Sequence, residues 1–197
     1  VKNIFSFLFA ILAIVAGFAY PVSPAQLSLV SMLTIGVPSF ILALEPNESI
    51  VRGNFLRGVL FRALPGGLTD VLISLGVVLF TIEFTELQAV QGSTINAILL
   101  AIVGFMVMYR VCQPFTTLRM VLCVLVAIGL ILSITMFAPL FALDPLGRKE
   151  VLVLIVFALL AYPMIAFISR VMDKCLKIYE KGRLTIYFNK SNREKSK

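Results

Sequence analysis

One apolar stretch near the N-terminus contains oxygen-bearing and helix-disturbing side chains. In the string SMLTIGVPSF, Ser31 and Thr34 are three residues apart, so their hydroxyls lie on one face of a helix. Pro38 has no backbone N–H and clashes with the carbonyl of Thr34, while Gly36 tolerates unusual backbone dihedrals. We therefore expect local unwinding over residues 34–37. Hydroxyl and freed carbonyl oxygens suit hard cations such as Ca²⁺, Na⁺ or K⁺. The structural alternative is a proline kink whose hydroxyls bond back to the helix.

Other apolar runs also contain isolated polar side chains. Asn3 and Ser6 lie three residues apart near the start of the chain, and an asparagine within a membrane span is costly unless it has a partner. Asp70 is the one acidic residue well inside an apolar run, which makes it a candidate for cation or proton binding. A structural or interfacial role is the alternative for Asp70, since Arg62 lies two turns earlier on a similar face.

Several classes of function are excluded by residues that the chain lacks. It has no histidine, so a Ser–His or Cys–His catalytic pair is absent and a zinc site would lack one of its usual ligands. Its cysteines, Cys112, Cys123 and Cys175, have no metal-binding or disulfide spacing. We predict no catalytic residue and no cofactor-binding residue in this chain. Nucleic acid is not expected as a partner, because the net charge of +7 comes from bases between apolar runs and in the tail.

The polar side chains must be positioned by membrane helices. Hydrophobic residues make up 60% of the 197 residues, and the mean hydropathy is +1.03. Apolar runs near the ~20 residues that a bilayer requires must be helices, because every backbone group needs an internal partner there. The predicted fold is an all-α polytopic membrane protein with six transmembrane helices. The predicted spans are Asn3–Tyr20, Gln26–Leu44, Val59–Ile82, Ile95–Cys112, Met120–Phe141 and Val151–Met172.

The distribution of basic residues predicts the orientation. Fifteen of the seventeen Lys and Arg residues lie at the N-terminus, in alternate loops or in the tail, and only Arg148 and Lys149 lie in the other set of loops. The positive-inside rule therefore places both termini in the cytoplasm. We expect a transmembrane domain over residues 1–178 and a basic cytoplasmic tail over residues 179–197, solvated or lying against anionic lipid.

The order of residues from Asn3 to Asn47 resembles the fifth and sixth transmembrane helices of P-type cation-transporting ATPases. In calcium pumps of this family a Pro-x-Gln-Leu hairpin exit leads into Asn-x-x-Thr-Asp-Gly-x-Pro, then Ala-Leu and a loop with proline. Without a gap, this chain has Pro24-Ala25-Gln26-Leu27, then Ser31-Met32-Leu33-Thr34-Ile35-Gly36-Val37-Pro38, then Ala43-Leu44-Glu45-Pro46-Asn47. It is most similar to the bacterial cation-transporting ATPase E-like subgroup.

The resemblance carries over residue by residue. The coordinating asparagine of the fifth helix falls on Asn3, and the glutamate one turn later falls on Ser6. On the sixth helix the asparagine falls on Ser31, the threonine on Thr34 and the aspartate on Ile35. Both helix carboxylates are thus absent, so the site should not copy a two-calcium arrangement. With Gly36, these side chains are the expected cation pathway, and calcium is the first expectation.

The resemblance also implies a longer protein. The six spans would be helices five to ten of a ten-helix pump in a bacterial plasma membrane, with a missing N-terminal part that uses ATP and Mg²⁺. This chain has neither a DKTGT phosphorylation segment nor a Gly-rich phosphate loop, so the resemblance implies no ATP hydrolysis by this chain alone. The expected partners are the lipid bilayer, the transported cation and that missing part. The alternative is a self-contained six-helix channel or permease, or a membrane scaffold subunit.

Overall fold

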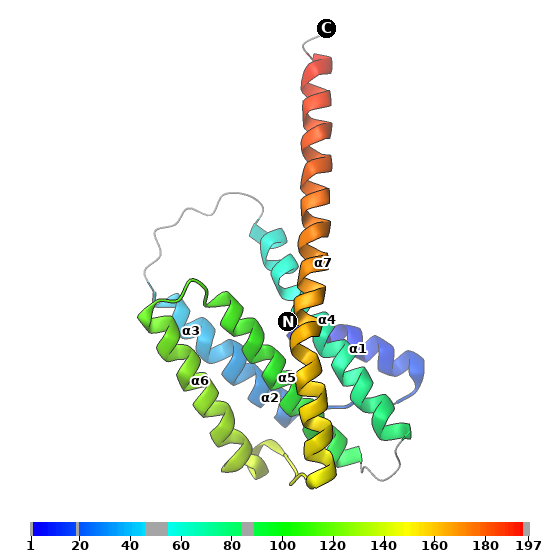
Figure 1. Ribbon diagram of the computed structural model, residues 1–197, viewed down its shortest axis with the longest axis vertical. Helices are drawn as coiled ribbons and strands as arrows, with labels where there is room; N and C mark the ends of the chain where they lie inside the picture. Colours follow the sequence, from blue (N-terminus) through cyan, green and yellow to red (C-terminus); the bar gives the residue numbers. More distant parts are fainter. Residues whose placement is uncertain (1, 19, 46–54, 84–88, 195–197) are drawn as a thin grey trace.

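The described regular elements are all helical, as the sequence predicts (Figure 1). The computed structural model describes the backbone of residues 2–18, 20–45, 55–83 and 89–194, and side chains within 3–18, 20–45, 63–83 and 91–175. The elements are α1 (Lys2–Ala16), α2 (Pro24–Ser31), η1 (Met32–Gly36), α3 (Val37–Ala43), α4 (Phe55–Glu83), α5 (Ala89–Val111), α6 (Thr117–Thr135), η2 (Ala138–Phe141) and α7 (Arg148–Glu194).

Five described helical segments are long and apolar enough to cross a bilayer, which makes the chain a multi-pass membrane protein. They are Pro24–Ala43, Ala63–Glu83, Gln91–Val111, Thr117–Thr135 and Arg148–Cys175. The predicted first span is not among them. With 15 residues, α1 is about 22 Å long, whereas the hydrocarbon core is about 30 Å thick. Six spans and cytoplasmic termini therefore stay predictions.

Two helix ends in the C-terminal half differ from the predicted span boundaries. The predicted span Met120–Phe141 is split, since α6 ends at Thr135 and the 3₁₀ helix η2 follows. Ala142, with a φ of 50°, then turns the chain away from η2. At the C-terminus the helical backbone of α7 continues beyond Met172, where the predicted span ends, to Glu194. The basic tail therefore begins as a helical extension of the last span.

The central helix of the bundle is α5. It packs against α4, α7, α2, η1 and α6, whereas α1 packs mainly on α4. Figure 1 shows α1 lying obliquely across α4, while α2 and α3 lie on the other side of the bundle. Pro21 and Pro24 in a turn between two apolar runs predict that the first two helices are antiparallel neighbours. In the structure α1 instead packs mainly on α4, because its aromatic face (Phe5 and Phe9, both 0% exposed) joins a core shared with Val71 of α4.

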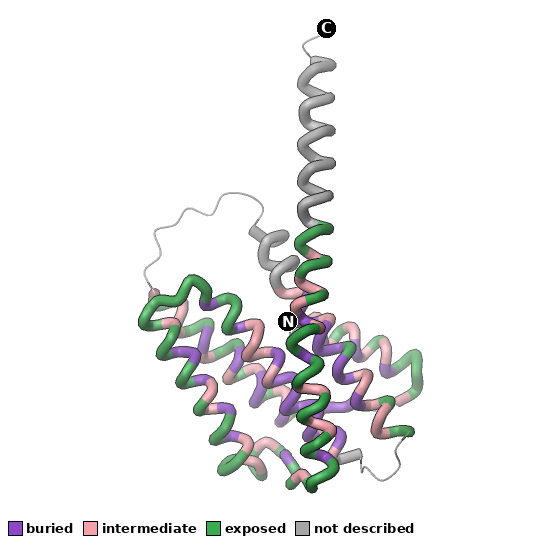
Figure 2. Tube along the Cα trace, viewed as in Figure 1, coloured by how far each residue is buried: buried purple, intermediate pink, exposed green. Residues whose placement is uncertain are grey.

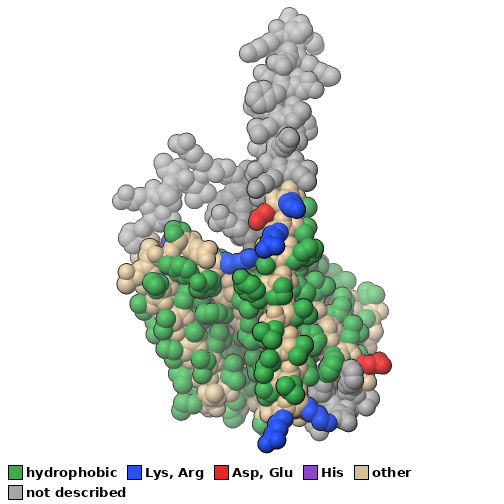
Figure 3. Space-filling model, in the orientation of Figure 1, with side chains coloured by type: hydrophobic (Ala, Val, Ile, Leu, Met, Phe, Trp, Pro, Cys, Tyr) green, Lys and Arg blue, Asp and Glu red, His purple; other side chains and the backbone are tan. Residues whose placement is uncertain are grey.

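Two apolar clusters hold the bundle together, and α4 and α5 contribute to both. One joins α1, α2, α4, α5 and α6, and the other joins α4, α5 and α7 around Val77, Leu99, Val103 and Ala161. Buried positions line the inner faces of the helices (Figure 2). The outer faces of α6 and α7 expose an apolar belt between basic groups at both ends (Figure 3). Such a belt is the surface expected of helices that contact lipid tails.

Candidate functional site

The irregular stretch is a π-helix, so the predicted unwinding is wrong. Over Met32–Gly36 the helix widens, and the N–H of Val37 donates to the carbonyl of Met32, five residues back. The physical reason lies in Pro38, which has no N–H for the carbonyl of Thr34 and whose ring would clash with it in a regular turn. Widening the turn relieves that clash without breaking the helix. Short π segments of this kind are frequent at functional sites.

The hydroxyls of Ser31 and Thr34 bond back to their own helix. Ser31 Oγ donates to the carbonyl of Leu27 at 2.5 Å, and Thr34 Oγ1 donates to that of Val30 at 2.6 Å. This is the hydrogen bonding of the structural alternative. Donating these bonds leaves the lone pairs of both hydroxyl oxygens free, so each oxygen can still accept a hydrogen bond or contact a cation.

A close helix contact surrounds Thr34. A Cβ added to Gly104 of α5 would lie 2.9 Å from Thr34 Oγ1 and 3.1 Å from its Cβ. Thr34 is accordingly buried and Ser31 is half-buried, whereas Gly36 is exposed. Ile35, at the position where the family has a carboxylate, is 41% exposed. The site at η1 therefore consists of hydroxyl and backbone oxygens packed against a glycine.

Asn3 and Ser6 are not brought to this site. Asn3 is exposed and Ser6 is half-buried, and both belong to α1, which packs on α4. The element that carries Thr34, η1, packs on α5 and α6. The structure therefore divides the predicted pathway residues between two separate helix contacts.

Asp70 is an interior residue of α4. It is 4% exposed, and its Oδ1 has no hydrogen-bond partner. The carboxyl of Asp70 therefore lies inside the helix bundle, and its structural or interfacial role stays a prediction. The side chain of Arg62 falls outside the described residues. The described part of the chain holds no group of three or more His, Cys, Asp or Glu side chains that could bind a metal ion.

Sequence reasoning missed Gln26, which joins three parts of the structure. With Ser23 it forms a capping box at the start of α2, in which each side chain accepts a hydrogen bond from the other's backbone N–H. Its amide also donates to the carbonyl of Ala142 at 2.8 Å and accepts from Ser93 Oγ at 2.7 Å. The Ser-x-x-Gln spacing is the sequence signal of such a cap. Gln26 thereby fixes α2 against α5 and the loop after η2.

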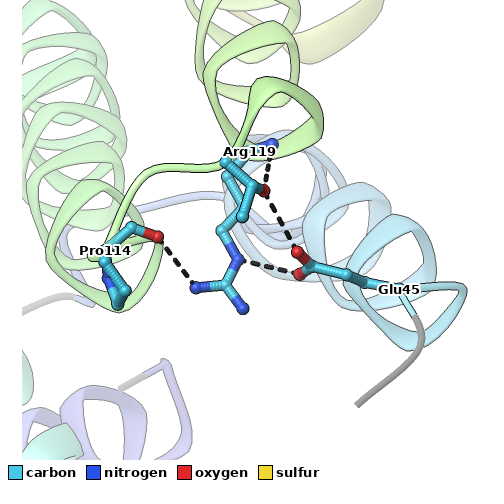
Figure 4. Close-up of polar contacts among 4 residues, drawn as sticks. Glu45, Pro114 and Arg119 are labelled. Atoms are coloured by element: carbon cyan, nitrogen blue, oxygen red, sulfur yellow. Dashed lines mark hydrogen bonds and ion pairs between the residues drawn. The ribbon is translucent and has the colours of Figure 1, made fainter.

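An ion pair fixes the opposite end of the same broken helix. Glu45, just after α3, accepts hydrogen bonds from Arg119 Nε at 2.8 Å and Thr116 Oγ1 at 3.0 Å (Figure 4). Arg119 also donates to the carbonyl of Pro114 at 3.0 Å. The hydrogen bond from Arg119 lowers the pKa of the Glu45 carboxyl below its ordinary value. The pair ties the end of α3 to the beginning of α6.

Comparisons with known proteins identify relatives of this chain. It is 33% identical over 163 residues to the calcium-transporting ATPase CtpE of Mycolicibacterium smegmatis, which covers 75% of this chain. It is 34% identical over 134 residues, or 63% of the chain, to the probable cation-transporting ATPase exp7 of Streptococcus pneumoniae. CtpE of Mycobacterium bovis is 31% identical over 144 residues, or 68% of the chain.

These relatives confirm the resemblance to the P-type ATPases. The alignments cover only 16–21% of the length of the relatives. The chain is therefore similar to one part of such proteins. No family model and no solved structure matches it.

Proposed function

We propose that this chain is the membrane part of an ATP-driven cation pump of the P-type, with calcium as the first choice of cation. The similarity to a calcium-transporting ATPase over three quarters of the chain carries this proposal. The π-helix at the predicted cation helix supports it, because that segment departs from regular helix at the residues that the family uses for coordination.

In this proposal the cation passes η1. Ser31 and Thr34 offer hydroxyl oxygens, and the backbone at Gly36 offers carbonyl oxygens, all of them hard ligands. Asn3 and Ser6 would add oxygens only in a state in which α1 lies beside η1. Pumping requires such discrete states, between which ligand binding shifts the population. Because no carboxylate stands at position 35, we expect a weaker site than one with charged ligands.

The rest of the pump supplies the energy. In this proposal, domains outside the chain bind ATP and Mg²⁺ and become phosphorylated. The proposed location is a bacterial plasma membrane, with the arginine-rich loops and both termini in the cytoplasm, as the distribution of bases favours. The ends carrying Glu45, Arg119 and the extended α7 would then face the cytoplasmic domains.

The test replaces pathway hydroxyls and amides in the full-length pump. We expect Thr34→Ala and Asn3→Ala each to raise the calcium concentration for half-maximal ATPase stimulation, by about tenfold for loss of one good ligand. Thr135→Ala is the matched control, since that hydroxyl also bonds back to its helix, at 2.9 Å, but lies exposed on α6. An unchanged ion dependence in both pathway variants would remove these residues from the pathway.

A channel or permease is the competing function. It would conduct calcium through vesicles containing this 197-residue chain in the absence of ATP. The pump proposal expects no such passive flux. If calcium flux is observed, and Thr34→Ala reduces it whereas Thr135→Ala leaves it unchanged, the chain functions as a channel and the pump proposal is wrong.

A further inference from the structure

A side-chain hydrogen bond joins the end of α5 to the outer edge of α7. The guanidinium of Arg110, one residue before α5 ends, donates from Nη1 to the hydroxyl oxygen of Ser169 on α7. Ser169 itself donates to the carbonyl of Ile165 at 2.6 Å, so its hydroxyl is oriented to accept from Arg110. This contact holds Arg110 beside α7 and leaves the other N–H donors of its guanidinium available to a ligand.

Two further bases of α7 lie beside this contact. Arg170 follows Ser169 directly, with Cα atoms about 3.8 Å apart, and Lys174 lies one turn beyond Arg170 on the same side. These two bases and Arg110 are exposed and form what we call the basic patch. Asp173 lies among them, but within the described residues no ion pair joins it to any of the three. Three positive charges and one negative charge leave the patch with a net charge of +2.

The basic patch lies at the level where a bilayer interface would cross α7. Arg170 follows Arg148 by 22 residues, or about 33 Å of helix, and the hydrocarbon core is about 30 Å thick. Between Glu150 and Arg170 this helix has no charged side chain. Figure 3 shows basic side chains gathered on this face, directly beyond the apolar belt. The patch is therefore at the depth of lipid phosphate groups.

An apolar stripe leads from the basic patch towards the middle of the membrane. Phe167, Pro163, Leu159 and Val156 precede Arg170 by 3, 7, 11 and 14 residues, which is the spacing of one helix face. Phe167, Leu159 and Val156 are 66%, 72% and 61% exposed, so no described element covers them. From Phe167 to Val156 the stripe is about 16 Å long, close to the ~15 Å depth of one leaflet.

The occupant that fits both surfaces has a phosphate group and apolar chains. A guanidinium presents parallel N–H donors that match the oxygens of a phosphate. Basic clusters at a membrane surface attract anionic lipids. A zwitterionic lipid would bring its own ammonium group to a patch that already has excess positive charge, and a soluble phosphate would leave the apolar stripe uncovered. Charge and apolar surface together therefore favour an anionic phospholipid.

From this geometry we propose that Arg110, Ser169 and Arg170 form a binding site for one anionic phospholipid. Arg110 and Arg170 bind the phosphodiester oxygens, Lys174 adds electrostatic attraction, and an acyl chain lies along the stripe below Arg170. Ser169 is a positioning residue, because it holds the guanidinium of Arg110 beside α7. The site requires that the chain lies in a bilayer, and it does not depend on cation pumping.

The first experiment measures lipid binding to the 197-residue chain by native mass spectrometry from detergent micelles. Phosphatidylglycerol and phosphatidylcholine are added in equal amounts in about 0.15 M ammonium acetate, which screens exposed charges more than ~8 Å apart. We expect the complex with one phosphatidylglycerol to be about tenfold more abundant than that with one phosphatidylcholine. Equal binding of the two lipids by the wild type overturns the proposal, and this outcome requires no variant to fold.

Charge variants locate the site. Arg110→Gln and Arg170→Gln should each weaken phosphatidylglycerol binding by about tenfold. Arg148→Gln is the matched control, because it removes the same charge from an exposed residue at the other end of α7. It should bind like the wild type. A loss in Arg148→Gln as large as that in Arg110→Gln would mean that overall charge attracts the lipid, and no site would remain.

A variant that keeps the charge distinguishes a built site from diffuse attraction by the basic patch or the basic tail. Ser169→Ala should weaken binding by about threefold, because Arg110 is no longer held in place. Added to Arg110→Gln, it should have no further effect, since the two residues act through one contact. Unchanged binding in Ser169→Ala overturns the proposal.

The last measurement separates a lipid from a soluble phosphate. Glycerophosphoglycerol is the headgroup of phosphatidylglycerol without its acyl chains. In excess it should leave the bound lipid in place, because the apolar stripe contributes to binding. Displacement of the lipid by this headgroup would identify a soluble phosphate ester as the ligand and overturn the lipid site.

Discussion

The polar groups of η1 and those of the α4–α5 interface meet the same buried environment in different ways. At η1 the irregularity is in the backbone, and the hydroxyls of Ser31 and Thr34 already donate to their own helix. At α4–α5 both helices are regular, yet Asp70, Ser74 and Asn96 keep unpaired atoms. A disturbed helix and an unsatisfied side chain are therefore separate indicators, and only the first can be read from proline and glycine in the sequence.

This contrast has an energetic consequence. The π-turn relieves the clash that Pro38 would cause, so few polar atoms of η1 lack a hydrogen-bond partner. More are left without one on α4 and α5, because nothing in the described structure pairs Asp70 Oδ1, Ser74 Oγ and Asn96 Oδ1. The following predictions test this contrast, beginning with the largest expected effect.

The close packing at η1 should be sensitive to one methyl group. Gly104→Ala would place a Cβ 2.9 Å from Thr34 Oγ1, and such overpacking typically costs about 1–3 kcal/mol of unfolding free energy. Thermal unfolding in detergent micelles measures the loss. Gly129→Ala is the control, since its Cβ would lie at an ordinary 3.4 Å from Leu33 Cδ2. If both variants unfold like the wild type, the Thr34–Gly104 contact does not constrain η1. Adding Thr34→Ala to Gly104→Ala should recover most of the loss, because the two sites share one contact.

Removing an unpaired hydroxyl should raise the free energy of unfolding, whereas the added methyl group at Gly104 should lower it. We expect Ser74→Ala to stabilise the chain by about 1 kcal/mol, because the buried oxygen has no partner to lose. Thr69→Val should change the unfolding free energy little, since bonding of a hydroxyl back to its helix contributes no net stability. The comparison uses the same unfolding measurement. A clear destabilisation by Ser74→Ala would mean that the hydroxyl has a partner, and the contrast with η1 would disappear.

The smallest effect is expected at the Glu45–Arg119 pair, which is partly exposed. The pKa of Glu45 is lowered in the folded state from its ordinary value of 4.5, first by the hydrogen bond from Arg119. The stabilisation is therefore complete above about pH 4.5 and is lost as the pH falls through the lower folded value. We expect Glu45→Gln to lower the midpoint temperature of thermal unfolding slightly at pH 7. Below the pKa of Glu45 in the folded state, the substitution should have no effect. A difference that stays constant across this range would show that charge is not what holds α3 to α6.

Several features of the candidate site could be predicted from the sequence, and others could not. The helix disturbance at Gly36 and Pro38 is local chemistry, and its position was predicted correctly. Its form was not predicted correctly. Both a widened turn and an unwound one accommodate the N–H that Pro38 lacks, and packing against α5 and α6 selects between them. The placement of Asn3 and Ser6 also depended on packing, since the aromatic face of α1 found its partners on α4.

By itself, the sequence determined that this chain is helical and lies in a membrane, because long apolar runs leave the backbone no other way to pair its polar groups. It also determined where the hard oxygen ligands lie along each helix, since the helical period is fixed. Only the tertiary structure decided which of those faces meet. Ser74 and Asn96 are 22 residues apart in the sequence, yet antiparallel packing of α4 and α5 brings them to within about one helical turn of the same level. That register is set by close contacts such as Thr81 on Gly92, which depend on the shapes of both helices together.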